Sequence, residues 1–281
     1  MRRIQSHVAA VVFVAVGVAC VAVPAAAQYL RYPTTGVPRN ADGTVNLSAP
    51  TPRTPDGKPD FSGIWITGKP LCPNPDPVTY LCGAELPLSR EGINFGIDMP
   101  GGLPYQPWLA ALVKERTAND AKDDPHVRCL PDTFVRAYGL PHLLKFIQTP
   151  GLLVMLNEMN AGYRQVFTDG RPMPTDPTPS WQGYSSATWS GDTLVVNTIG
   201  FRDDIWIDIQ GSMLTESAKV QERIRRPDYG HLEIELTVDD PKAYTKPWTV
   251  TLKQRIAVDT ELVDEICLEN EQSYQRMKNV K

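Results

Sequence analysis

Carboxylates and basic residues alternate along residues 219–226, a pattern that could support acid–base chemistry. Val220, Glu222, Ile224 and Arg226 would share one face of a strand, because successive side chains of a strand point to opposite faces. If the two apolar residues point inward, Glu222 and Arg226 do so too. A buried carboxylate or guanidinium is costly unless it is partnered, so the pattern indicates a ligand site. The alternative is a solvated edge strand whose charges face water.

A second group of carboxylates surrounds a tryptophan in the segment DDIWID at 203–208. An aspartate beside an aromatic wall could act as a general base with a raised pKa. The alternative is a loop of turn-forming aspartates around a packing tryptophan. The candidate catalytic residues are Asp203, Asp208, Glu222 and Tyr244, with Arg223, Arg226, Tyr244 or Lys246 as candidates to stabilise an oxyanion.

Aromatic and basic residues also fall near the ends of the expected strands, where barrels place their selectivity residues. The candidate ligand-binding residues are Trp181, Tyr184, Trp206, Arg223, Arg226, Lys246 and Trp248.

Other chemistries lack their residue patterns. The histidines His126, His142 and His231 lie in different segments and form no H-x-H or H-x-x-x-H pair, so we expect no metal. No G-x-S-x-G elbow and no glycine-rich phosphate loop occurs, so we expect neither a serine nucleophile nor a nucleotide or other cofactor. With 28 Lys+Arg against 32 Asp+Glu, the net charge is -4, which excludes a large basic face for nucleic acid.

The amino terminus has the pattern of an export signal. Arg2 and Arg3 precede an apolar run over 8–23, and alanines at 25–27 provide a cleavage site before Gln28. We expect residues 1–27 to be removed and the protein to be periplasmic or secreted, without a membrane segment afterwards. The alternative, a membrane anchor, would need an apolar run of roughly 20 residues.

Four cysteines follow the predicted signal: Cys72, Cys82, Cys129 and Cys267. An even count in an oxidising compartment suggests two disulfides, for which three pairings are possible. Cys72 and Cys82 flank a proline-rich loop and form a natural local pair, which leaves Cys129 to pair with Cys267.

Proline is abundant, with 26 in 281 residues, which argues against a helical bundle. We expect residues 28–60 to form an extended arm and residues 61–281 a single domain with a loop and helix insertion at about 69–141. Within that insertion, apolar residues at helical spacing predict one short helix near 107–118.

For the rest of the domain, the residue pattern predicts a series of short consecutive strands. They are expected at 61–66, 143–148, 152–158, 163–168, 184–189, 193–199, 220–226, 231–238, 248–256 and 262–268. Most are joined by short turns, as in an antiparallel up-and-down β-barrel or a strongly bent meander, because closure removes exposed strand edges. A barrel of this size is wide enough to hold one small ligand.

Several motifs carry a resemblance. They include TPDGKPDFSGIW at 54–65, KDDP at 122–125 with CLP at 129–131, FTDGRP at 167–172, GDTLVV at 191–196 and DDPKAYTKPW at 239–248. As a set they resemble a large, uncharacterised family of secreted bacterial proteins, and the G-x-W at 63–65 is similar to the start of lipocalin-like barrels. The resemblance implies export and a common fold, and it carries no reaction. That family often has two histidines in the segment matching 213–219, and this chain has none there.

Two functions fit these patterns. The first is a secreted barrel that binds a small, partly apolar or aromatic molecule. The alternative is a cofactor-free periplasmic lyase, isomerase or hydrolase that uses carboxylate general acid–base catalysis inside the barrel. A structural surface protein without a small-molecule site is the third possibility.

Overall fold

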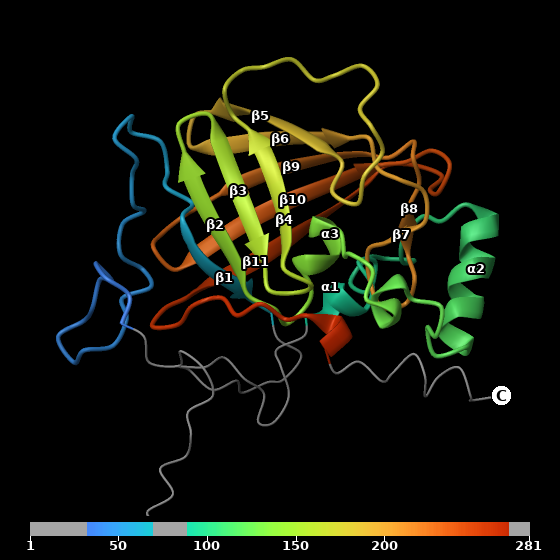
Figure 1. The fold of residues 1–281 in the computed structure, drawn as a ribbon, viewed down its shortest axis with the longest axis horizontal. Coiled ribbons are helices and arrows are strands. Elements are labelled where there is room, and N and C mark those ends of the chain that lie inside the picture. Colours follow the sequence, from blue (N-terminus) through green and yellow to red (C-terminus); the bar gives the residue numbers. More distant parts are fainter. Residues whose placement is uncertain (1–32, 70–88, 270–281) are drawn as a thin grey trace, which may run out of the picture.

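The computed structural model describes residues 33–69 and 89–269, and within these ranges nine strands close into a barrel (Figure 1). In order around the barrel they are β1 (Gly63–Thr67), β11 (Trp248–Ala257), β10 (His231–Asp239), β9 (Lys219–Arg225), β6 (Thr193–Ile199), β5 (Tyr184–Ser190), β4 (Gly162–Phe167), β3 (Leu152–Asn157) and β2 (Leu144–Thr149). The predicted mostly-β barrel is confirmed.

One pair of neighbours departs from the expected antiparallel pattern. Strands β4 and β5 run parallel, and their ladder covers only the pairs Val166–Ser185 and Phe167–Ser186. The other neighbouring pairs of the barrel are antiparallel. Strand direction alternates in an antiparallel sheet, so an odd number of strands closes only if one pair runs parallel. The β4–β5 junction is therefore a short seam in the wall.

The last predicted strand, at 262–268, was wrong. This segment is an extended strap that makes a single bridge between Met159 and Glu265 and ends in a short 3-10 helix, η2 (Cys267–Glu269). Strand β11 pairs with β10 on one side and β1 on the other. No edge of β11 remains for a further strand, which explains why the strap runs outside the barrel.

Apart from η2, the described helices lie between β1 and β2 in the chain. They are α1 (Arg90–Ile93), α2 (Pro107–Ala118), η1 (Pro125–Arg128) and α3 (Phe134–Ala137). The predicted helix near 107–118 is α2, which begins at a proline whose missing N–H would be unpaired in a first turn anyway. A two-stranded ribbon, β7 (Ile205–Trp206) with β8 (Met213–Leu214), adjoins them. No helix in the described ranges has the length and apolar character needed to span a membrane.

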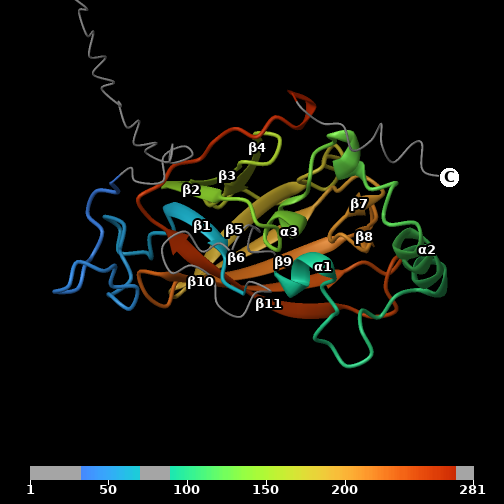
Figure 2. The ribbon, with the colours of Figure 1, turned by 90° about the horizontal axis from the view of Figure 1, so that it is seen from below.

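The arm covers the opposite end of the barrel from α2 and the β7–β8 ribbon (Figures 1 and 2). Its described part, residues 33–60, forms ion pairs with the segment after β11, through Arg39–Asp259, and with the β5–β6 turn, through Arg53–Asp192. Gly230 donates its N–H to Leu47, and a Cβ at this glycine would lie 2.6 Å from the Leu47 Cβ. Only glycine allows the arm to approach this closely. The predicted signal at 1–27 lies outside the described residues.

Alternation along the strands fills the lumen. Leu232, Ile234, Leu236 and Val238 of β10 are all fully buried, as their shared face predicts. The other strands contribute large side chains such as Trp65, and most of the interior is packed with apolar groups. The exceptions include a group of polar side chains near α3, which forms the candidate site.

Candidate functional site

An ion pair lies inside the barrel, between Arg164 of β4 and Glu222 of β9. Nη2 of Arg164 is 2.5 Å from Oε2 of Glu222, and Nη1 is 3.1 Å from Oε1. The two side chains are 2% and 0% exposed. Both strands place these residues inward by alternation, since each shares a face with buried aliphatic residues. The result is a two-pronged, charge-assisted contact shielded from water.

Neighbouring side chains complete this network. Arg164 donates from Nε to Ser185 Oγ at 3.1 Å and from Nη2 to Thr198 Oγ1 at 3.0 Å. Tyr138, which follows α3, donates its hydroxyl to Glu222 Oε1 at 2.7 Å. Burial, and next the Glu222 charge, raise the pKa of Tyr138 well above its usual value, so the hydroxyl keeps its proton. Both carboxylate oxygens of Glu222 therefore have donors.

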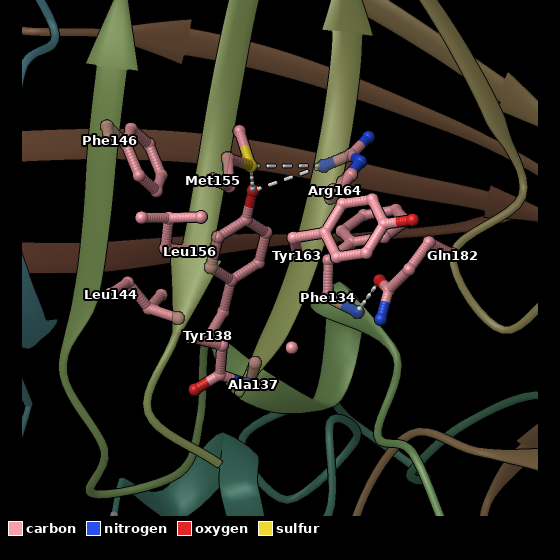
Figure 3. Close-up of a pocket in the computed structure, with 12 residues that line it drawn as sticks. Phe134, Ala137, Tyr138, Leu144, Phe146, Met155, Leu156, Tyr163, Arg164 and Gln182 are labelled. Carbon is pink, nitrogen blue, oxygen red and sulfur yellow. Dashed lines mark hydrogen bonds between the residues drawn. The ribbon is translucent and has the colours of Figure 1, made fainter. Parts of the chain in front are cut away.

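A pocket opens beside this network, between α3 and strands β2, β3 and β4 (Figure 3). It spans about 310 Å³, including its mouth, and its enclosed part has room for on the order of one water molecule. Most of its wall is apolar or aromatic. The lining residues are Phe134, Ala137, Tyr138, Leu144, Phe146, Met155, Leu156, Asn157, Gly162, Tyr163, Arg164 and Gln182.

The seam between β4 and β5 explains where this pocket lies. The short ladder pairs Val166 and Phe167, so residues 162–165 have no strand neighbour on that side within the described part of the chain. Gln182 borders the gap, and both ends of its amide are fixed. Its Oε1 accepts from the Phe134 N–H at 2.9 Å, and its Nε2 donates to the Asp132 carbonyl at 2.7 Å. The pocket wall is therefore held in place by α3 and its preceding loop.

The predicted pair Glu222 and Arg226 is buried, but the structure does not bring the two together. Arg226 lies at the arm end of the barrel, where it donates to the carbonyls of Asp60 at 2.5 Å and Tyr229 at 2.6 Å. Burial lowers the pKa of Arg226 to about 10. Its guanidinium also lies 4.9 Å from the centre of the Trp65 ring. Arg226 thus joins the arm to the barrel, and Glu222 pairs with Arg164 instead.

Three predicted site residues, Asp208, Tyr244 and Trp248, gather in a second buried region next to α1. The Tyr244 ring centre lies 5.5 Å from that of Trp248, and the Tyr244 hydroxyl donates to the Met213 carbonyl at 2.9 Å. Asp208 accepts from the N–H groups of Phe95, Gln210 and Ser212 at 3.0–3.3 Å. None of the three predicted residues lines the pocket.

Burial raises the pKa of Asp208 to about 6, from an ordinary value of 3.8. The folded state therefore binds this proton more tightly than the unfolded chain does. The contribution of Asp208 to the free energy of unfolding should fall as pH rises from about 4 to about 6, by about 3 kcal/mol in all.

Asp208→Asn, which is neutral at every pH, should remove this slope from urea unfolding curves recorded between pH 4 and 7. Asp176→Asn, in an exposed loop, is the matched control and should keep it. An Asp208→Asn protein with the same slope as the control would contradict this assignment.

The remaining predicted site residues are spread over the barrel surface and the end of the barrel near α2 and the β7–β8 ribbon. Asp203 accepts from the Glu216 N–H, and Trp206 is buried beneath the Arg116 guanidinium. Arg223 faces outward beside Glu235, and Lys246 lies in an exposed loop. The Arg202 guanidinium covers the Trp181 ring, and the Tyr184 ring packs against the Phe167 ring at a tilt. The structure does not bring these residues into one site.

The cysteine prediction is confirmed for one pair. Cys129 and Cys267 form a disulfide with a Cα–Cα distance of 5.4 Å. Cys72 and Cys82 lie outside the described residues.

The three histidines that follow the predicted signal each contact one carboxylate. The pairs are His126 with Asp132, His142 with Glu265, and His231 with Asp228. Over the described ranges, no three His, Cys, Asp or Glu side chains are grouped so as to hold a metal.

Sequence reasoning missed Arg164 and Tyr138. Arg164 carries a usable signal, because it alternates with Val166 in β4 and so belongs to the buried face. Tyr138 carries none, because a single helical turn has no periodicity to mark its inner side.

No protein-family model, curated protein or solved structure matches this chain. The resemblance to secreted bacterial proteins therefore stays a prediction.

Proposed function

We propose that this protein is an exported β-barrel that binds a small, partly apolar or aromatic molecule in the pocket between α3 and strands β2–β4. The observation that carries the proposal is the composition of that pocket. Its wall is mostly apolar and aromatic, with a few fixed polar groups, which is the usual make-up of a small-molecule site. Its enclosed part has room for on the order of one water molecule, so most of a ligand would lie in the open mouth and the ligand must be small.

Export is supported by two independent features. The chain begins with the predicted signal, and the Cys129–Cys267 disulfide is a bond that persists in oxidising compartments. We therefore place the binding activity in the periplasm or outside the cell.

Binding is favoured over carboxylate catalysis by the contacts of the candidate bases. Glu222 accepts from Arg164 on both oxygens and from Tyr138 on Oε1, and its side chain is fully buried, so the carboxylate is paired and shielded from a substrate proton. Asp208 is fully buried away from the pocket and accepts from three backbone N–H groups. Neither carboxylate is placed to meet a molecule in the pocket.

Tyr163 offers a direct test, because it lines the pocket but is 64% exposed and contributes little to the core. Tyr163→Ala should weaken the binding of a small aromatic compound about three- to tenfold, since an aromatic contact contributes about 0.5–1.5 kcal/mol. Binding is measured by saturation-transfer NMR and calorimetry with benzamide, benzoate and benzamidine.

Ile147→Ala is the matched control, because Ile147 is also an exposed apolar residue of the barrel but does not line the pocket. It should leave affinity unchanged. The proposal is overturned if none of the three compounds binds, or if Tyr163→Ala and Ile147→Ala have the same affinity.

A further inference from the structure

We infer that the ligand of this pocket is an uncharged aromatic compound with a carbonyl or similar hydrogen-bond acceptor. This inference rests on the proposed binding function and narrows it to one ligand class. Three features of the pocket carry it: the balance of charge, the supply of donors, and the aromatic wall.

The charge at the pocket is already balanced. Arg164 is the one charged residue among those that line it, and its guanidinium forms a two-pronged ion pair with Glu222. A ligand carboxylate would lose its water and gain no unpaired cation, and it would lie near the Glu222 carboxylate. A ligand ammonium would likewise find no unpaired anion. Burying either charge without a partner costs several kcal/mol, so the pocket favours a neutral molecule.

Arg164 nevertheless has one N–H to offer. A guanidinium carries five N–H groups, and four are used by Ser185, Thr198 and the two oxygens of Glu222. The fifth, on Nη1, has only long contacts, 3.5 Å to the Tyr138 hydroxyl and 3.6 Å to Met155 Sδ (Figure 3). A charged donor with such weak partners gains from a better acceptor.

The other polar groups of the wall point to the same requirement. Asn157 accepts from the Met159 N–H through Oδ1, which leaves its amide N–H₂ as a donor. Gln182 is committed at both ends of its amide, and the Tyr138 hydroxyl donates to Glu222. The polar groups of the pocket wall that remain available are therefore mainly hydrogen-bond donors, from Arg164 and Asn157. A carbonyl oxygen on the ligand would accept from them.

Aromatic rings set the shape of the pocket. The Arg164 guanidinium covers the Phe134 ring at 3.4 Å from its centre, and this stack forms part of the inner wall. Tyr163 also lines the pocket and is largely exposed. Because the enclosed part holds only about one water molecule, a flat ligand ring would lie in the open mouth, where the Tyr163 ring can make the offset or edge contact that aromatic pairs prefer.

Benzamide, benzoate and benzamidine test this inference, because they share one ring and nearly one shape but are neutral, negative and positive at pH 7. Calorimetry on the wild-type protein should give benzamide an affinity at least about tenfold above that of either charged compound. Asn157→Leu should weaken benzamide binding about threefold or more by removing a donor. Gln165→Leu, which changes an outward residue of β4 outside the pocket lining, should leave it unchanged.

The outcomes separate the two proposals. Tighter binding of benzoate or benzamidine, with Tyr163→Ala still weakening it, overturns the neutral-ligand inference and leaves the binding function standing. Equal benzamide affinity in Asn157→Leu and Gln165→Leu also counts against the inference. The absence of binding by all three compounds removes the proposed function and the inference together.

Discussion

Replacing Glu222 with leucine, while Arg164 stays in place, should lower the free energy of unfolding by about 3–5 kcal/mol. The guanidinium would then remain inside the barrel, where its side chain is 2% exposed, without its carboxylate partner. The Tyr138 hydroxyl would lose its acceptor as well. Urea unfolding, followed by tryptophan fluorescence, measures the loss.

The double variant Arg164→Met/Glu222→Leu should recover much of this loss, because an apolar pair of similar volume leaves no buried charge behind. The expected signature is a double variant more stable than Glu222→Leu alone. Glu235→Leu is the control, since its exposed partner Arg223 lies 3.6 Å away on the outer face, and such a surface pair contributes about 0–1 kcal/mol. Equal losses in Glu222→Leu and Glu235→Leu would show that the inner pair carries no special weight.

Removal of the Cys129–Cys267 disulfide should have the second largest effect. The bond closes a loop with a sequence separation of 138, so it restricts the unfolded chain strongly. The Cys129→Ser/Cys267→Ser variant should lose about 2–5 kcal/mol of stability, which thermal and urea unfolding measure without a reductant. An unchanged melting temperature would contradict this expectation.

The loss should also appear locally in the strap. Val263 and Glu265 donate their N–H groups to Glu158, and these contacts hold the strap against the β3–β4 turn. Hydrogen exchange at these two amides should speed up more than at the β10 amides, which lie within ladders on both sides. A uniform increase across the barrel would instead indicate that the disulfide stabilises the fold as a whole.

Local patterns were enough to predict much of the fold. Alternation over 231–238 placed every second residue from Leu232 to Val238 on an inner face, and the same argument turned Glu222 inward. Pro107 and the helical spacing after it marked α2. These signals survive because the side-chain direction in a strand or helix depends on the backbone of that segment alone.

The partners across the barrel were decided by tertiary structure. Alternation predicts which face of a strand a residue occupies, but it does not predict which strand lies opposite. The sequence therefore suggested Arg226, in the same predicted strand, as the neighbour of Glu222. The actual partner, Arg164, is 58 residues away in the sequence and was missed. Closure of nine strands forced the parallel β4–β5 seam beside which the pocket lies, and it left no edge of β11 for the segment at 262–268. Such features depend on how many strands complete the circle, a property of the whole sheet that no single segment carries.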